Sequence, residues 1–167
     1  MEMGKGCRKD NQNVYFQARK NAAMYNERLR SREGTSESLG ISVSALADYE
    51  LGITKVVPVD KVVLMADLYN APELKAMYCK NECPIGRTMH IATEVKGIEG
   101  AALRLVHEFE SRKIEDIRRE FTQIALDGEV SDDEKEMLKD VLEKICELEL
   151  VLNEIELIGK KIVGEEE

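Results

Sequence analysis

Residues 31–52 of the chain read SREGTSESLGISVSALADYELG, and this stretch predicts two short helices joined by a tight turn. Ser31 is placed to cap the first helix, because its hydroxyl can accept a hydrogen bond from an unpaired backbone N–H. Gly40 is placed to end that helix, since glycine adopts a positive φ at low cost. Ser42 can cap the second helix in the same way. Two short helices with such a turn form a helix-turn-helix, whose second helix can enter the major groove of DNA.

The same residues carry a family resemblance. Glycine, aliphatic and glutamate positions agree in one register at Gly40-Ile41-Ser42, Leu46, Glu50 and Gly52, and then at Pro58-Val59-Asp60, Leu64 and Ala66-Asp67-Leu68-Tyr69. Over about residues 14–78 the chain resembles the lambdoid phage repressors and Cro proteins, the XRE-type helix-turn-helix family. The resemblance implies an N-terminal lambda-repressor-like domain of five helices that binds DNA. Within it, the first helix of the motif is less apolar than in the family, because Gly34, Thr35 and Ser36 stand in its middle.

Composition and charge favour a helical protein with two unlike parts. The chain has 167 residues, of which 34% are charged and 5% aromatic, with no Trp. This mixture is typical of helices and coiled coils. Residues 1–61 contain ten Lys/Arg and eight Asp/Glu, whereas the remainder contains fourteen and twenty-five. We therefore expect a near-neutral DNA-binding part joined to an acidic helical part.

The expected organisation has five segments. We predict a flexible arm over 1–12, a DNA-binding domain over 13–83, a linker over 84–100, a dimerisation region over 101–163 and an acidic tail over 164–167. Inside the first domain we expect helices over 14–27, 60–70 and 72–78 besides those of the motif. The fourth of these five helices, 60–70, is expected to turn Val63, Leu64, Ala66 or Asp67, and Leu68 inward, with Asn70 as a left-handed cap.

The C-terminal part predicts an antiparallel helical hairpin. Apolar residues recur at spacings of three and four through 101–126, and again after the capping box at 131–134. The second helix then carries a coiled-coil seam at Leu138, Val141, Ile145, Leu148, Leu152 and Ile155. One hairpin covers so wide an apolar face poorly, so we expect a homodimer that joins two hairpins in a four-helix bundle. The alternative is a monomer whose hairpin folds back on the DNA-binding domain.

The resemblance also implies which residues contact DNA. Base-edge contacts are expected at the start and exposed face of the second motif helix, at Val43, Ser44, Ala47 and Asp48, and its cap Ser42 is included among the DNA-binding residues. Phosphate contacts are expected from Arg32 and Lys55, with Lys5, Arg8, Lys9, Arg19 and Lys20 as further candidates. For any one of these basic residues, plain surface solubility is the competing interpretation.

Other chemistry finds little support in the sequence. Cys79 and Cys83 allow a metal site with His90 or a redox disulfide, but incidental cysteines are the favoured interpretation because a second regular Cys/His pair is missing. No nucleophile elbow, P-loop or dinucleotide motif occurs, so we expect neither an enzyme nor a cofactor. The four cysteines without a signal peptide, and no apolar run near the ~20 residues of a membrane span, predict a cytoplasmic protein with no membrane contact.

Two functional hypotheses follow. The first is a sequence-specific transcriptional regulator, a repressor that binds a palindromic operator in double-stranded DNA as a dimer. The second is a protein–protein interaction module that keeps the fold without reading DNA, because the second motif helix offers Asp48 but no Arg, Gln or Asn at its expected base-contacting positions. A ligand-gated regulator stays open, since no pocket can be read from a sequence.

Overall fold

The computed structural model describes residues 13–94, 97–126 and 128–164. Over these ranges the regular structure consists of eight α-helices and two short 3-10 helices, with no strand. The predicted all-α class is therefore confirmed for the described residues. The predicted arm at 1–12 and residues 165–167 of the predicted tail lie outside them.

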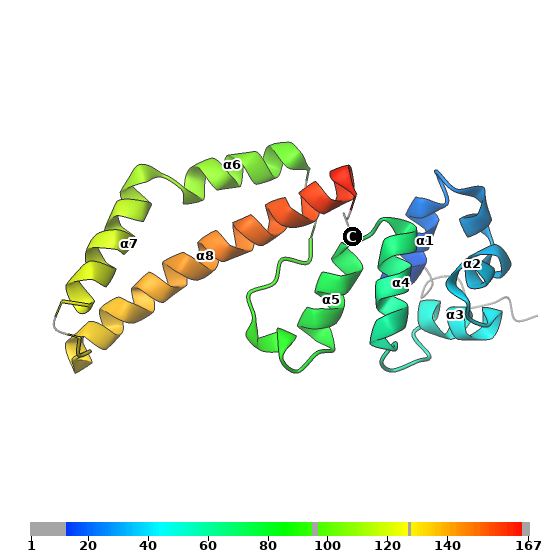
Figure 1. The fold of residues 1–167 in the computed structure, drawn as a ribbon, viewed down its shortest axis with the longest axis horizontal. Coiled ribbons are helices and arrows are strands. Elements are labelled where there is room, and N and C mark those ends of the chain that lie inside the picture. Colours follow the sequence, from blue (N-terminus) through cyan, green and yellow to red (C-terminus); the bar gives the residue numbers. More distant parts are fainter. Residues whose placement is uncertain (1–12, 95–96, 127, 165–167) are drawn as a thin grey trace, which may run out of the picture.

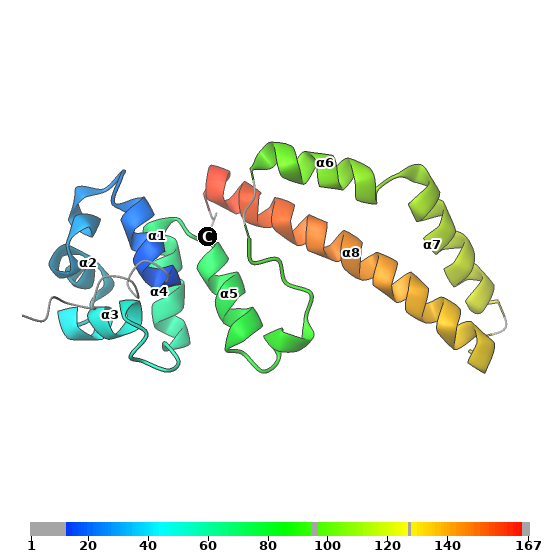
Figure 2. The ribbon, with the colours of Figure 1, turned by 180° about the vertical axis from the view of Figure 1, so that it is seen from behind.

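The first group of helices packs around one apolar core (Figures 1 and 2). It comprises α1 (Val14–Ala22), η1 (Glu27–Arg30), α2 (Arg32–Leu39), α3 (Val43–Glu50), α4 (Val59–Tyr69) and α5 (Glu73–Asn81). Side chains from η1 to α5 are almost completely buried in this core, among them Leu29, Leu39, Leu46, Val62, Met65 and Leu74. The core fixes α2 and α3 relative to the helices behind them.

The caps of α2 and α3 are those that the sequence predicts. Ser31 Oγ accepts a hydrogen bond of 3.1 Å from the N–H of Gly34, and Ser42 Oγ accepts one of 3.1 Å from the N–H of Ala45. Gly40 ends α2 with a φ of 62°, in the left-handed region that glycine tolerates. Both capping predictions and the role of Gly40 are confirmed.

Two helices differ from the sequence expectation. α1 ends at Ala22 rather than at residue 27, and a separate 3-10 helix follows. α4 keeps Asn70 as its left-handed cap, and Ala66 is buried as predicted, but the predicted inward face is wrong at Val63 and Leu64, which are 40% and 43% exposed. Besides Ala66, the buried residues of α4 are Val62, Met65 and Tyr69. Because residues 62–65 are all apolar, their pattern does not fix the inward side, and packing against α1 and α2 decides it.

The polar middle of α2 has a structural reason. A Cβ on Gly34 would lie 2.4 Å from the carbonyl oxygen of Arg28, so η1 approaches the α2 backbone too closely for any side chain. Thr35 and Ser36 are buried, and their hydroxyls donate to the carbonyl oxygens of Ser31 at 2.8 Å and Glu33 at 2.9 Å. Buried hydroxyls that are paired in this way carry little desolvation penalty.

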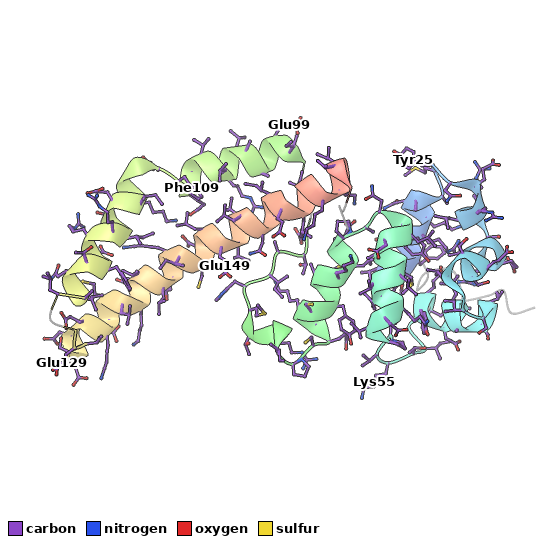
Figure 3. The ribbon with its side chains drawn as sticks, in the orientation of Figure 1. Tyr25, Lys55, Glu99, Phe109, Glu129 and Glu149 are labelled. Atoms are coloured by element: carbon purple, nitrogen blue, oxygen red, sulfur yellow. The ribbon has the colours of Figure 1, made fainter. Side chains whose placement is uncertain are left out.

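The second group consists of three helices. α6 (Ile98–Glu108) and α7 (Ser111–Ile124) run along α8 (Asp132–Val163) in the opposite direction (Figure 1). The expectation of one continuous helix over 101–126 is wrong, because the chain leaves the helix at Phe109 and Glu110, where Figure 3 labels Phe109. The predicted capping box at the start of α8 is confirmed: Ser131 N donates to Glu134 Oε2 at 2.9 Å, and Ser131 Oγ accepts from Glu134 N at 3.4 Å.

The end of α8 returns to the first group of helices. Lys161 Nζ lies 2.6 Å from Glu73 Oε1 on α5, and the amide of Asn70 donates to the carbonyl oxygen of Lys161 at 3.1 Å. The segment between the groups contains the short helix η2 (Gly86–Thr88) and an irregular stretch over 89–94. Among the described helices none is both long and apolar enough to cross a membrane.

Candidate nucleic-acid interface

The first turn of α3 lies open to solvent. Ser42, Val43 and Ser44 are exposed there, whereas Ala47 and Asp48 are half-buried further along the helix. The carbonyl oxygen of Asp48 accepts hydrogen bonds from the N–H groups of the following loop, so that loop folds back over the C-terminal end of α3. The five residues of this helix that are expected to bind DNA therefore divide into three that are exposed to solvent and two that are partly covered.

A buried carboxylate anchors the other side of α3. Glu50 is 0% exposed, and its Oε1 lies 2.5 Å from Arg19 Nε on α1 while its Oε2 lies 2.7 Å from Arg32 Nε on α2. Arg19 is 2% exposed and also donates to the carbonyl oxygen of Leu29 at 3.0 Å. One carboxylate therefore holds α1, α2 and α3 together, and charged partners on both sides offset its desolvation.

Arg32 and Arg19 have other roles than the sequence predicts. Arg32 was expected to contact phosphate, yet its guanidinium is paired with Glu50 and its side chain is largely covered. Arg19, a further phosphate candidate, is buried inside the domain, so that interpretation is wrong. The sequence does contain a signal for this cluster: Glu50 lies four residues after the buried Leu46, on the same face of α3. A carboxylate on an inward face needs a buried cation, which α1 supplies.

The remaining basic candidates are unevenly placed. Lys55 is exposed in the loop after α3 and points away from the helices (Figure 3). Lys20 is exposed on α1, with its ammonium 5.5 Å from the centre of the Phe16 ring. Lys5, Arg8 and Lys9 lie outside the described residues. Exposed acids on α2, namely Glu33 and Glu37, face solvent near this surface as well.

Two phenols of this domain are shielded from solvent: Tyr69 is buried and Tyr15 is half-buried. Burial, with a smaller contribution from the Glu82 carboxylate, raises the pKa of Tyr15 to about 12. Burial, followed by the Glu50 carboxylate, also raises the pKa of Tyr69 above its ordinary value. Both phenols are therefore neutral at physiological pH. Among the described residues the Tyr69 hydroxyl has no hydrogen-bond partner.

The predicted dimerisation residues of α8 occupy different environments. Ile145 and Leu152 are 40% and 50% exposed, while Leu138, Leu148 and Ile155 are half-buried. Val141 is 0% exposed within the chain itself, so it is not available to a second copy and its assignment to an interface is corrected. Sequence periodicity did not separate these cases, because buried and exposed apolar residues of α8 alike recur at spacings of three and four.

The cysteines form no metal cluster in the part of the chain that the structure describes. Cys79, Cys83 and Cys146 are free and half-buried. His90, the suggested third ligand, lies with its Nδ1 3.6 Å from Glu149 Oε2. Sequence reasoning also missed the buried Glu154 of α8, which pairs with Arg104 of α6.

Comparisons of the chain with protein-family models, curated proteins and solved structures return no match. The interface is therefore interpreted from its own geometry.

Proposed function

We propose that the chain is a sequence-specific DNA-binding transcriptional regulator and that α2 and α3 form its helix-turn-helix. The observation that carries the proposal is the exposed first turn of α3 on a helix pair that is fixed from behind. Gly40 sets the turn, and Glu50 ties α3 to α1 and α2. A recognition helix contacts base edges through its N-terminal residues, so this end must be open while the rest of the helix is held.

The exposed side chains can read bases in a limited way. Ser42 and Ser44 can donate or accept at a base edge, and Val43 can contact a thymine methyl group. Asp48 can accept a hydrogen bond from cytosine N4. Lys55 supports the arrangement, because a cation in the loop after the recognition helix can reach the phosphate backbone. The N-terminus of α2, next to Arg32, adds the partial positive charge of a helix end.

We also propose that the regulator acts as a homodimer through its C-terminal helices. Exposed apolar side chains lie beside the buried stripe of α8 at Leu142, Ile145 and Leu152, and further ones lie on α6 at Leu103 and Val106. Large apolar side chains gathered on one region of a surface commonly mark an interface. Joining two such arms would form a helical bundle and present two recognition helices to two half-sites.

The test is a selection of duplexes from a random-sequence library with the whole chain, at low and at physiological salt. We expect a palindromic motif with half-sites about one helical turn apart. Retention that carries no motif and disappears at the higher salt would mean phosphate binding alone. No retention at either salt would overturn the proposal.

A matched pair of lysine variants locates the surface on the selected duplex. Lys55→Ala should weaken binding uniformly across sequences and reduce the slope of log K against log salt by about 1. Lys139→Ala removes an exposed lysine of α8, far from α3, and should leave that slope unchanged. Arg32→Ala is a poor probe, because it would also disturb the buried Glu50.

One observation favours a second candidate function, a protein–protein interaction module. Glu33, Glu37 and Asp48 put negative charge on α2 and α3, whereas Arg32 is paired internally. Such a face repels phosphates and suits a basic protein surface. Under this alternative the duplex selection returns nothing at either salt, and Lys55→Ala has no effect on DNA retention.

A further inference from the structure

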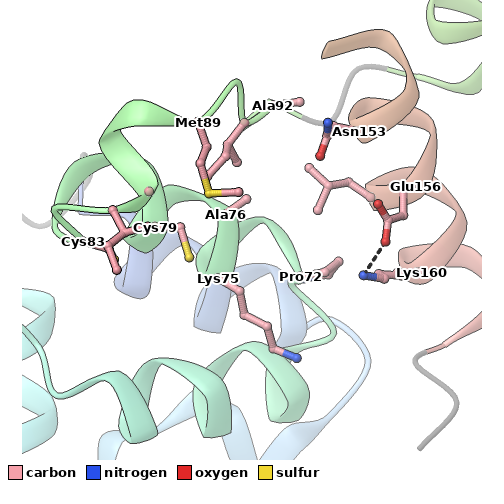
Figure 4. Close-up of a pocket in the computed structure, with 14 residues that line it drawn as sticks. Pro72, Lys75, Ala76, Cys79, Cys83, Met89, Ala92, Asn153, Glu156 and Lys160 are labelled. Atoms are coloured by element: carbon pink, nitrogen blue, oxygen red, sulfur yellow. Dashed lines mark ion pairs between the residues drawn. The ribbon is translucent and has the colours of Figure 1, made fainter. Parts of the chain in front are cut away.

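A cavity lies where the two groups of helices meet. It has a volume of about 510 Å³, is open to solvent on one side and is lined by α5, the segment around η2 and the C-terminal half of α8 (Figure 4). Small-molecule sites commonly have volumes of about 300–1,000 Å³ and occur preferentially where two parts of a chain meet. The cavity is therefore of the right size and in the right place for a small ligand.

Most of the cavity wall is apolar. Ala76 and Cys79 contribute from α5, Met89 and Ala92 from the segment after η2, and Leu157 from α8. The alanines keep the space open, and the thioether of Met89 adapts readily to the shape of an occupant. Wall residues from both helix groups would thus contact the apolar body of a ligand together.

The turn at η2 forms a firm side of the cavity. A Cβ on Gly86 would lie 2.1 Å from the carbonyl oxygen of Cys79, so this turn is pressed directly onto α5. Gly86 is itself buried. The segment that carries Met89 and Ala92 therefore begins at a turn that is packed directly against α5 at Gly86.

The polar groups of the cavity carry balanced charges. Lys160 Nζ lies 2.8 Å from Glu156 Oε1, and Lys75 Nζ lies 2.7 Å from Asp67 Oδ1. Each lysine therefore already has an acidic partner. A charged ligand would leave water without finding an unpaired counter-charge, which costs free energy.

Asn153 supplies a directed hydrogen-bond acceptor. Its amide nitrogen donates to the carbonyl oxygen of Glu149 at 2.8 Å. This bond fixes the orientation of the amide and does not use its side-chain oxygen. Figure 4 shows this oxygen on the cavity side of α8. A carbonyl oxygen in this position suits a ligand with an N–H or O–H donor.

We propose that this cavity binds a small uncharged amphiphilic molecule, with an aliphatic body between α5 and Leu157 and one amide or hydroxyl donor on Asn153. The proposal goes beyond the DNA-binding function and does not depend on it, since none of these residues belongs to α2 or α3. The ligand would contact both groups of helices at once and so would hold α8 against α5.

The cysteines provide a position-specific test with octanamide as the probe. Cys79 and Cys83 line the cavity, whereas Cys146 lies in a separate groove beside His90. Alkylation of the whole chain by iodoacetamide is followed by mass spectrometry of tryptic peptides, and cleavage after Lys80 separates Cys79 from Cys83. At about ten times its Kd, octanamide should slow alkylation of both cavity cysteines by about tenfold and leave Cys146 unchanged.

Charged analogues of the same length test the head group. Octanoate and octylammonium should protect Cys79 and Cys83 less than octanamide does. Equal or stronger protection by either ion overturns the assignment of an uncharged ligand. Absence of protection by octanamide, or equal protection of Cys146, overturns the site itself.

Two phenylalanine variants separate the cavity from the general surface. Ala92→Phe fills the cavity and should abolish the protection of Cys79 and Cys83, whereas Ala102→Phe places the same ring on the exposed face of α6 and should retain it. Protection that persists in a folded Ala92→Phe chain overturns the proposal. If that variant does not fold, the comparison of cavity cysteines with Cys146 in the unaltered chain still decides.

Discussion

The carboxylate of Glu50 joins α3 to α1 and α2. It is fully buried, and both of its oxygens are taken up by guanidinium groups of Arg19 and Arg32. Removing one member of a buried ionic cluster leaves an unpaired charge in a low-dielectric interior, which costs more than the intact cluster contributes.

Glu50→Ala should therefore lower the free energy of unfolding by about 3–5 kcal/mol, because Arg19 stays buried without its partner. Glu37→Ala removes an exposed carboxylate of α2 and should change it by less than about 0.5 kcal/mol. Urea unfolding followed by circular dichroism measures both. A cost below about 1 kcal/mol for Glu50→Ala would contradict the role given to this cluster.

Two helical glycines should respond oppositely to the same substitution. Gly34→Ala would place a Cβ 2.4 Å from the carbonyl oxygen of Arg28, and such a clash costs about 1–3 kcal/mol. Gly159 in α8 has open space around the same atom, so Gly159→Ala should stabilise the chain by up to about 1 kcal/mol through helix propensity. Thermal unfolding of the two variants gives the signs, and a stabilised Gly34→Ala chain would show that η1 does not press on α2.

At the scale of helices, local signals were predictable and packing was not. The caps at Ser31, Ser42 and Ser131 and the positive φ of Gly40 follow from residue type and spacing, because each depends on atoms a few residues away. The inward side of α4 depends on which neighbours it meets, so a run of four apolar residues could not reveal it. The clustering of Glu50 with Arg19, 31 residues apart, and the cavity at α8 likewise require the folded chain.

The start of α8 depends on its capping box. Ser131→Ala removes the hydroxyl that accepts a hydrogen bond from Glu134 N. We expect it to lower the free energy of unfolding by about 1 kcal/mol. Ser38→Ala is the matched control, because it removes an exposed hydroxyl inside α2 that bonds to the Gly34 carbonyl oxygen and caps no helix end. It should change the free energy of unfolding by less than about 0.5 kcal/mol. Hydrogen exchange in the first turn of α8 reports the cap directly. Unchanged exchange in Ser131→Ala would contradict the prediction.

At the scale of the whole molecule, the proposed homodimer would depend on the exposed apolar side chains of α8. Leu152 is half exposed on that helix, and placing a charge there would bury an unpaired carboxylate in a dimer. Leu152→Asp should raise the dimer dissociation constant about ten- to a hundredfold, since burial of a leucine contributes about 1.5–3 kcal/mol. Analytical ultracentrifugation over a concentration series measures this constant.

Ile53→Asp is the matched control, because it puts the same charge on an exposed apolar position of the first group of helices. It should leave the dimer constant unchanged. A monomer at every concentration of the unaltered chain, or equal effects of the two variants, would contradict association through α8.

The contact between the C-terminal end of α8 and the first group of helices has a mechanical consequence. Its 32 residues make it about 48 Å long at 1.5 Å per residue. Lys161 in its last turn bonds to Asn70 and Glu73, and Glu149 nearer its middle lies beside His90. A rotation of α8 by about 10° about these C-terminal contacts, which lie beside the cavity, would move its N-terminal end by about 8 Å, given that length. In a pair of copies joined along these arms, a slight adjustment at Pro72 or Leu157 would become a large change in the separation of the two α3 helices.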